Sequence, residues 1–331
     1  MTTNLNNHIV VQRLARDLGL RSSAEPVSKI VEFCRCKVQK LIEDFDGPNT
    51  PAEILPWLAG KLSTCFIEIN DDSDLDRVTA EYGKKKEYAF ATLEQEFSGC
   101  TEGITLRLSR RQLWEPEFAS IIDCRGRRKL RRYHTKWHEL VHLLTMTDQS
   151  RMEFRRTHEV GQEKTAEEKL VDIVAGELSF FPEFVKPYIQ GEITFARIEQ
   201  IRSLFCPDAS LTSSAINISK MWNSPCIWIE ARLQAKKGAG VGARPALRAV
   251  KVAENTAARE RGLRMIVNFR VPESSIVFRS FHGQTFDSEA FENLNWWEAS
   301  SGTHLENRLI KVQVKNFGDS VQAFITPAKS H

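Results

Sequence analysis

His138, Glu139 and His142 form the pattern H-E-x-x-H inside the apolar stretch from Trp137 to Leu144. Residues four apart lie on the same face of a helix, so the two imidazoles can bind one zinc ion. Glu139 lies about 100° further around the helix, where its carboxylate can take a proton from a water molecule at the metal's open position. The spacing therefore predicts a zinc hydrolase, most often a peptidase, although the same side chains also occur as ordinary polar residues on a helix surface.

A catalytic zinc site needs a third protein ligand, and Glu168 is our first candidate. Glu168 and Asp172 are four residues apart and share one helix face. Asp172 can then accept a hydrogen bond from the outer nitrogen of a zinc-bound histidine. Thr165 and Glu168 also fit the capping-box pattern S/T-x-x-E, which gives the Glu168 carboxylate an alternative role at the helix start. The other acidic candidates for the third ligand are Glu163, Glu167 and Glu177.

The composition is that of a globular protein. Of the 331 residues, 41% are hydrophobic and 27% charged, and the formal net charge is +3, which excludes a disordered chain and a global polycation. The seven cysteines are odd in number and lack the spacing of a disulfide framework, which predicts reduced thiols. The N-terminal residues lack a signal-peptide pattern and no run of 18 apolar residues occurs, so we expect a soluble cytoplasmic protein without a membrane partner.

The spacing of apolar residues predicts a helical first half that contains three strands. The strands are expected at Cys65–Asn70, Ile104–Leu108 and Ala119–Cys124, and the last of them is expected to border the metal site. The helices are expected over 25–45, from 51 to 62, through much of 73–98, around the H-E-x-x-H motif, from Thr165 to Phe181, near 193–205 and over 211–222. Strand-like runs dominate after Pro225, at 226–233, 247–252, 264–271, 275–281, 309–314 and 321–325.

Two segments together resemble the ImmA/IrrE family of metallopeptidases. They are WHELVHLL, from Trp137 to Leu144, and EKLVDIVAGEL, from Glu168 to Leu178, which is followed by Pro182. The family pattern is A-H-E-L-x-H and then E-x-x-A/C-N/D-x-F-A-A-x-L-L-M-P. Trp137 replaces the usual small residue, and Asp172 stands where Asn is common. The resemblance covers residues 25–190, and the layout beyond them is similar to the IrrE type.

The resemblance implies an α+β protein in three parts. A mainly helical, zincin-like metallopeptidase domain with a small antiparallel sheet would occupy 1–190. A helical segment similar to a helix-turn-helix would occupy 191–223, and a GAF-like α+β sensor domain would occupy 224–331. The resemblance also implies that His138, His142 and Glu168 bind zinc, with Glu139 as the general base.

The family resemblance further implies a substrate, which is a DNA-binding transcriptional repressor cleaved in response to DNA damage or phage infection. We expect a repressor of the helix-turn-helix type that is encoded nearby. Within the family, the CapP group lies beside CBASS anti-phage operons and cleaves a partner repressor, and the basic run described next makes that group attractive.

A run of cations lies directly before the metal-binding motif, and such a cluster suits contacts with phosphate. Single-stranded DNA would be a sensible signal of damage or infection for a peptidase that must be inactive by default. The alternatives are a solvated basic face and a docking surface for an acidic segment of the repressor. The candidate nucleic-acid contacts are Arg125, Arg127, Arg128, Lys129, Arg131 and Arg132.

Cys124 ends the strand that is expected to border the metal, so its sulfur is a candidate inhibitory ligand. A thiolate in the zinc's open position would displace the catalytic water and hold the enzyme inactive. The alternative is a small buried side chain in a strand, which is a common place for cysteine.

These residues predict a cytosolic zinc endopeptidase in which Glu139 first accepts a proton from water and then delivers it to the leaving amine. The substrate is expected to pair as an added strand beside Ala119–Cys124. The rival hypothesis is a DNA-binding regulatory protein on a peptidase scaffold, in which the zinc is only structural. Glu139 argues against the rival, because a structural zinc site does not need it.

Overall fold

The computed structural model of the chain describes residues 5–43, 45, 50–99, 101–147, 153–157, 164–236, 243–285, 288–297 and 305–328, without the side chains of 154–157. The fold is α+β, and it divides into two compact units. The first unit comprises Met1–Phe184 with Ser203–Ser210, and the second comprises Val185–Arg202 with Leu211–His331. The six cysteines within the described residues carry free thiols. None of the described helices has the length and apolar character needed to cross a bilayer.

The first unit is built on a mixed sheet whose strand order is β1-β3-β2-β4. Strand β1 runs parallel to β3, whereas β2 is antiparallel to both β3 and β4. This arrangement corrects the expectation of an antiparallel sheet. The strands are β1 (Thr64–Ile69), β2 (Thr101–Arg107), β3 (Phe118–Asp123) and β4 (Glu153–Thr157).

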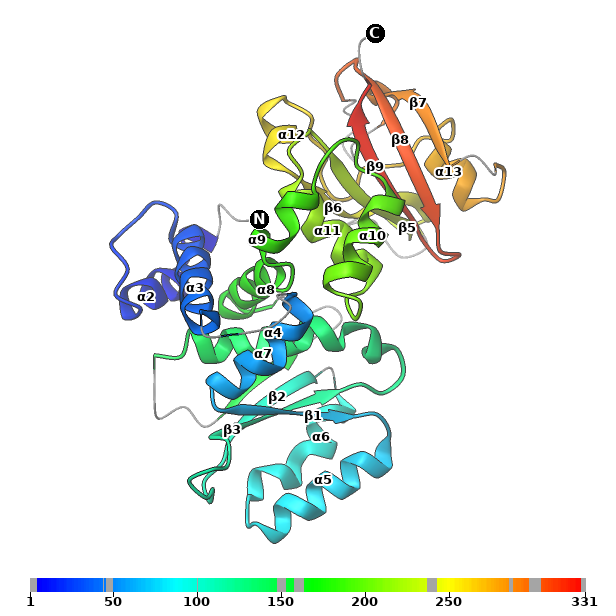
Figure 1. Ribbon diagram of the computed structural model, residues 1–331. Helices are drawn as coiled ribbons and strands as arrows, with labels where there is room; N and C mark the ends of the chain where they lie inside the picture. Colours follow the sequence, from blue (N-terminus) through cyan, green and yellow to red (C-terminus); the bar gives the residue numbers. More distant parts are fainter. Residues whose placement is uncertain are drawn as a thin grey trace. The chain divides into compact units, whose positions relative to one another are not determined.

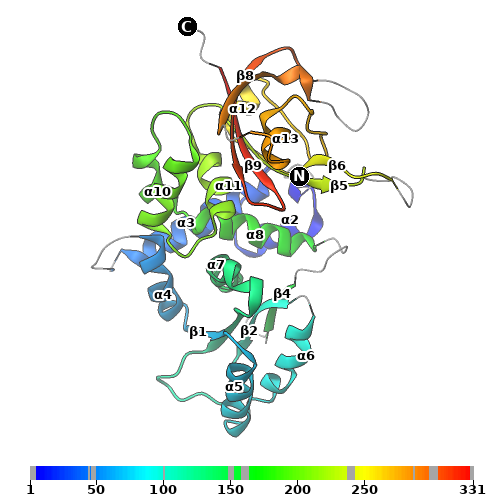
Figure 2. The same ribbon diagram turned by 90° about the vertical axis from the view of Figure 1, so that its right-hand side faces the viewer.

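One face of this sheet is covered by a layer of short helices that follow β1 in the chain (Figures 1 and 2). Alternate residues of the strands point into this layer, among them Ile69, Ile104 and Ile121, and they form one apolar cluster with the helices. The helix α5 begins at a cap in which Asp71 accepts a hydrogen bond from the Asp74 backbone. The elements of the layer are α5 (Asp72–Lys84), η1 (Tyr88–Thr92) and α6 (Leu93–Ser98).

The opposite face is crossed by α7, which carries the H-E-x-x-H motif, and further helices pack over α7 (Figures 1 and 2). Because α7 lies between the sheet and these helices, every residue from Trp137 to Leu144 is buried. The 3-10 turn η2 (Gly126–Arg131) leads directly into α7. The helices of this layer are α2 (Ile9–Asp17), α3 (Pro26–Ile42), α4 (Pro51–Lys61), α7 (Arg132–Leu144) and α8 (Ala166–Leu178).

The second unit is built on an antiparallel sheet of order β6-β5-β9-β8-β7. One face carries the apolar core, including Trp297, Ile310 and Ile276, and the other face packs against helices through contacts such as Phe195 with Phe324. Its elements are α10 (Phe195–Phe205), α11 (Leu211–Met221), β5 (Ile227–Gln234), β6 (Ala246–Glu254), α12 (Thr256–Glu260), α13 (Ile276–Phe281), β7 (Glu289–Asn293), η4 (Leu294–Trp296), β8 (Leu309–Asn316) and β9 (Val321–Pro327), preceded by α9 (Pro182–Val185) and η3 (Lys186–Tyr188).

The helical segment 191–223 is not a unit of its own, because most of α10 and all of α11 belong with the second sheet. The prediction of a strand over 275–281 is wrong. Ser275 caps a helix there by accepting a hydrogen bond from the Val277 backbone, and the helix packs its β-branched residues into the core. Strands β4 and β7 were not predicted, and 264–271 contributes only an isolated bridge to the sheet.

Strand β3 lies inside the first sheet, paired with β1 on one side and β2 on the other. Its backbone groups are therefore already used along both sides. The expectation that a substrate pairs beside Ala119–Cys124 is wrong for this reason, because only an edge strand can accept a further strand. Among the described strands, β1 and β4 are the edges of this sheet.

Helix α7 lies close to β2 at Gly103. A Cβ atom at this position would lie 2.7 Å from Cγ2 of Thr135 and 2.8 Å from Oε1 of Glu139, both of which are on α7. These distances are too short for any real side chain, so only glycine allows the helix to lie this close to the strand. The absence of a side chain at Gly103 thus sets the distance between the motif and the sheet.

We predict that Gly103→Ala lowers the free energy of unfolding by about 1–3 kcal/mol, because the new methyl group forces α7 away from β2. Chemical denaturation of the purified protein measures this change. Gly60→Ala is the matched control, since a Cβ there meets nothing within 4 Å. It should leave stability unchanged or raise it by up to about 1 kcal/mol. Equal stability of the two variants would contradict the close-approach argument.

Candidate metal centre

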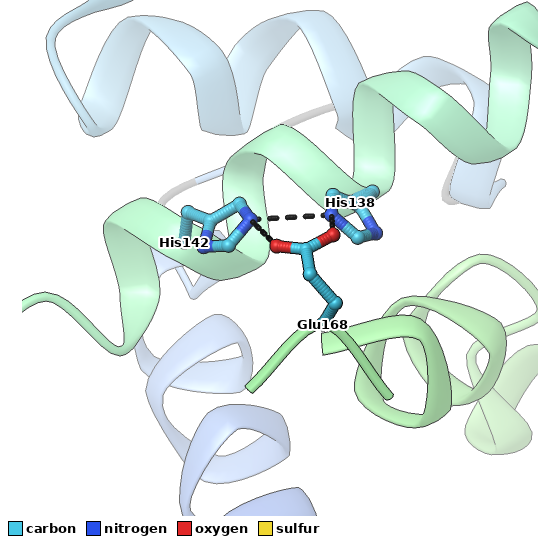
Figure 3. A group of neighbouring side chains, drawn as sticks. All are labelled: His138, His142 and Glu168. Atoms are coloured by element: carbon cyan, nitrogen blue, oxygen red, sulfur yellow. Dashed lines mark hydrogen bonds and ion pairs between the residues drawn. The ribbon is translucent and has the colours of Figure 1, made fainter. Parts of the chain in front are cut away.

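Helices α7 and α8 bring His138, His142 and Glu168 together. Figure 3 shows the two imidazoles projecting from one helix and the Glu168 carboxylate turned toward both from the other. The Nε2 atoms of the histidines are 3.1 Å apart. Each of them lies 3.2 Å from one carboxylate oxygen of Glu168. Among the described residues, these three form the one group of His, Cys, Asp or Glu side chains arranged to hold a metal ion.

The hydrogen bond between His138 and Asp172 leaves the lone pair of the His138 Nε2 atom pointing into this triangle. Its Nδ1 lies 3.0 Å from Oδ1 of Asp172, and a carboxylate can only accept, so the proton is on Nδ1. The Nε2 lone pair then faces Oε2 of Glu168, which is buried and meets no hydrogen-bond donor among the described residues. Two acceptors 3.2 Å apart repel each other unless a cation lies between them. The arrangement therefore fits a bound metal ion.

Asp172 contacts the outer nitrogen of His138, as the sequence predicts. Its second oxygen, Oδ2, accepts a hydrogen bond of 2.5 Å from Nζ of Lys164, just before α8. The carboxylate is thus held from both sides, by His138 and by Lys164. This fixes the orientation of the His138 ring and favours a basic Nε2.

The side chain of Glu168 belongs to the cluster, whereas its backbone N–H takes part in the cap of α8. The Thr165 hydroxyl accepts a hydrogen bond of 3.2 Å from the Glu168 backbone, which starts α8. The carboxylate itself points to the histidines, so the two roles that the sequence allows are divided between backbone and side chain.

Glu139 is fully buried on the side of α7 that faces the sheet. The hydroxyl of Thr105 on β2 donates a hydrogen bond of 2.7 Å to its Oε2. Its Oε1 packs against Gly103 and has no hydrogen-bond partner among the described residues. Burial raises the pKa of this carboxyl above its usual range, although His142 and His138 act in the opposite direction. A carboxylate that gains from taking a proton is suited to act as a general base.

Cys124 does not face the cluster, which corrects the expectation that it is an inhibitory ligand. Its Sγ is not among the grouped ligand atoms, and the charges that act on it are Glu68, Lys136, Arg132 and the adjacent Asp123. Lys136 lies about 160° around α7 from His138, so the cysteine is on the other side of the helix. Burial raises the pKa of the thiol to about 11, which keeps it protonated.

The basic run before α7 is largely neutralised within the protein. Arg125 and Arg128 both pair with the buried Asp123, which precedes them at the end of β3. Arg131 pairs with Glu102, and Arg132 with Asp208 and Glu68. In the part of the chain that the structure describes, Arg127 and Lys129 are the exposed members of the run outside these ion pairs. Contact with nucleic acid remains a prediction, and it now depends mainly on these two cations.

Sequence reasoning missed Gly103 and Thr105, which hold the general base candidate in place. Both lie on β2 and, being two residues apart, share the face toward α7. A glycine inside a strand often marks a close approach of another segment, and that signal was present at Gly103. The identity of the approaching residue had no such signal, because it depends on strand order.

No protein-family model matches this chain, and no curated protein matches it either.

We predict that Asp172→Ala weakens the binding of a divalent metal ion, with zinc as the probe, by about 10- to 100-fold, because His138 loses the group that orients its ring. Competition with a chromophoric chelator measures the dissociation constant. Glu167→Gln is the control, since Glu167 is on the same helix outside the cluster. Similar affinities for both variants would show that Asp172 does not support the site.

We predict that Glu139→Gln makes the metal-free protein more stable at pH 8. The folded state raises the pKa of this carboxyl, so it binds protons more tightly than the unfolded state does. The ionised form therefore costs stability at high pH, and this cost disappears as the pH falls through the folded pKa. Thermal melting at pH 8 and pH 5 should show a gain for the variant that shrinks at the lower pH. A gain that is larger at pH 5 would refute the assignment.

Proposed function

We propose that this protein is a zinc-dependent endopeptidase. The observation that carries the proposal is the buried triangle of His138, His142 and Glu168 with the fully buried Glu139 beside it. Ionised groups are costly to bury without a partner, and a cluster of them that includes carboxylate oxygens unpaired among the described residues is typical of a site that binds an ion or carries out a reaction. Two imidazoles, one carboxylate and a neighbouring unliganded carboxylate are together the donor set of a hydrolytic metal site.

Zinc is the metal that the spacing favours. A tetrahedral zinc ion with bonds of about 2.0–2.1 Å separates its ligand atoms by about 3.3–3.4 Å. The two Nε2 atoms are 3.1 Å apart, and each lies 3.2 Å from a Glu168 oxygen. Histidine nitrogens also favour zinc over magnesium or calcium, which prefer oxygen ligands. Three protein ligands leave one tetrahedral position for substrate or water.

The side chains then divide the reaction between them. When bound, zinc supplies a Lewis acid that polarises the scissile carbonyl and makes water more acidic. Glu139 accepts the proton of the attacking water on the carboxylate oxygen that Thr105 does not occupy. It then delivers this proton to the leaving amine. Asp172 keeps the ring of His138 fixed throughout.

The substrate is expected to bind along β4. Residues three apart on a helix differ by about 60° in direction, always in the same sense. Lys136 reaches Glu68 on β1, and Glu139 reaches Thr105 on β2. His142, three residues after Glu139, is turned by a further ~60° in the same sense. In the sheet order β1-β3-β2-β4, this rotation points it past β2 toward β4. An extended peptide paired with this edge would pass the open position of the metal.

We further propose a DNA-binding repressor as the substrate, cleaved after DNA damage or phage infection. The support is the resemblance of the two helices, from Trp137 to Leu144 and from Glu168 to Leu178, to the ImmA/IrrE family. The second unit, an antiparallel sheet with helices on both faces, would serve as the GAF-like sensor that the same resemblance implies.

The rival hypothesis of a regulatory protein with a structural zinc accounts less well for Glu139. A structural ion requires only its ligands. It does not require an additional carboxylate, fully buried and with one oxygen unbonded among the described residues, next to the ligands. Such a group lowers stability without helping a structural site, so we favour the enzyme.

We predict that the zinc-loaded protein cleaves peptides and that Glu139→Gln lowers the rate by at least about 100-fold. A library of proteome-derived peptides, analysed by mass spectrometry for new termini, reveals cleavage even while the natural substrate is unidentified. The helix-turn-helix protein encoded nearest to the gene should then be tested as an intact substrate, with and without single-stranded DNA.

Zinc content separates loss of catalysis from loss of metal. The Glu139→Gln variant should hold one zinc ion per chain, as the unmodified protein does, whereas Glu168→Ala should lose the metal. If the Glu139→Gln variant cleaves as fast as the unmodified protein at equal zinc content, the peptidase proposal fails.

A further inference from the structure

Three buried hydroxyls form a hydrogen-bonded chain that ends at Glu139. Oγ1 of Thr105 on β2 lies 2.7 Å from Oε2 of Glu139 and 2.7 Å from Oγ of Ser120 on β3. The Ser120 hydroxyl lies 3.0 Å from Oγ1 of Thr64 on β1. The chain thus crosses three adjacent strands on the face that α7 covers, and each of its hydroxyl-bearing residues is buried.

The chemistry of Glu139 fixes the direction of this chain. A hydroxyl has one proton to donate, and the Thr105 proton goes to the carboxylate. Thr105 must therefore accept from Ser120, and Ser120 must accept from Thr64. All three donors then point toward Glu139. Aligned hydroxyls polarise one another, which strengthens the last bond in the chain.

The opposite face of the same strands carries the residues that serve packing alone. There the residues that alternate with the hydroxyls, including Ile104, Leu106 and Ile121, form an apolar cluster. Buried hydroxyls stabilise a core less than aliphatic side chains of similar size. Their placement on the α7 face, in line with Glu139, points to a role in the site.

We propose that Thr105 is a positioning residue for Glu139 and that Ser120 and Thr64 orient its hydroxyl. This inference rests on the proposed peptidase function. The bond from Thr105 holds Oε2, while Gly103 leaves room for Oε1 beside the strand. The carboxylate is thereby kept in one orientation, with Oε1 as the oxygen that takes the proton.

The kinetic test compares Thr105→Val with Thr105→Ser on a peptide identified in the library experiment. Valine keeps the shape of the side chain and removes the hydroxyl, whereas serine keeps the hydroxyl. We expect Thr105→Val to lower kcat by about tenfold or more, as the loss of one hydrogen bond to a charged group predicts, with KM and zinc content unchanged. Thr105→Ser should recover most of the rate. Equal rates for Thr105→Val and the unmodified protein, or no recovery with serine, would overturn the proposal.

Ser120→Ala tests the rest of the chain. It removes the donor to Thr105, so we expect a decrease in kcat that is smaller than that of Thr105→Val. Thr145→Val is the matched control, because the buried Thr145 hydroxyl bonds to the Val141 carbonyl of its own helix and has no link to the chain. The control should change stability without changing kcat. A decrease in kcat equal to that of Ser120→Ala would overturn the role of the chain.

A readout without substrate separates this inference from the peptidase proposal. In the full-length, metal-free protein with isotope-labelled glutamate, subtracting the infrared spectrum of Glu139→Gln isolates the carboxylate band of Glu139. We expect Thr105→Val to shift this band and Thr105→Ser to leave it near its original position. An unshifted band in Thr105→Val overturns the inference even if peptides are cleaved. A shifted band in a protein that cleaves no peptide supports the positioning contact while the peptidase proposal fails.

Discussion

The structure depends on the burial of ionisable side chains in the middle of α7. His138, Glu139 and His142 are each at most 1% exposed, on a helix that has the sheet on one side and other helices on the other. Removing such groups from water is costly unless each finds a partner. The partners are Asp172 and Glu168 from α8 on one side and Thr105 from β2 on the other. The sheet and α8 thus have to lie where they do for this helix to be buried at all.

That constraint explains which parts of the site the sequence can predict. His138, Glu139 and His142 are close in the chain, and the helical repeat alone places them on adjoining faces. Glu168 and Asp172 are also one helical turn apart, and the Thr165 cap marks where their helix begins. The pairing of two local patterns therefore recovers the ligands. The contacts from β2 depend on a sheet order that no local pattern encodes, so Thr105 and Gly103 were missed.

The same limit explains the elements of the fold that were predicted incorrectly. Ile276 and Val277 have a high preference for strands, but the Ser275 cap and packing against the second sheet make them the first turn of α13. The residues of β3 correctly predict a buried strand. Nothing in the local sequence shows that β1 pairs parallel to β3 and occupies the backbone groups along one of its sides. A strand can be recognised from its own residues, but the strands that pair with it cannot. The expected role of Ala119–Cys124 as the strand that accepts the substrate depended on those pairing strands.

The direction of each residue around α7 accounts for Cys124 and for the two cations on this helix, Arg132 and Lys136. Arg132 and Lys136 lie on the side of the helix toward β1, where they pair with Glu68 and where Cys124 also lies. Glu139 faces β2, and His138 and His142 face α8. Lys136 and Cys124 are therefore on the other side of α7 from His138, although both are close to the motif in the chain. Proximity in sequence suggested that Cys124 regulates the metal, but the phase of α7 places this cysteine beside Arg132 and Lys136, which anchor the helix on the sheet through Glu68.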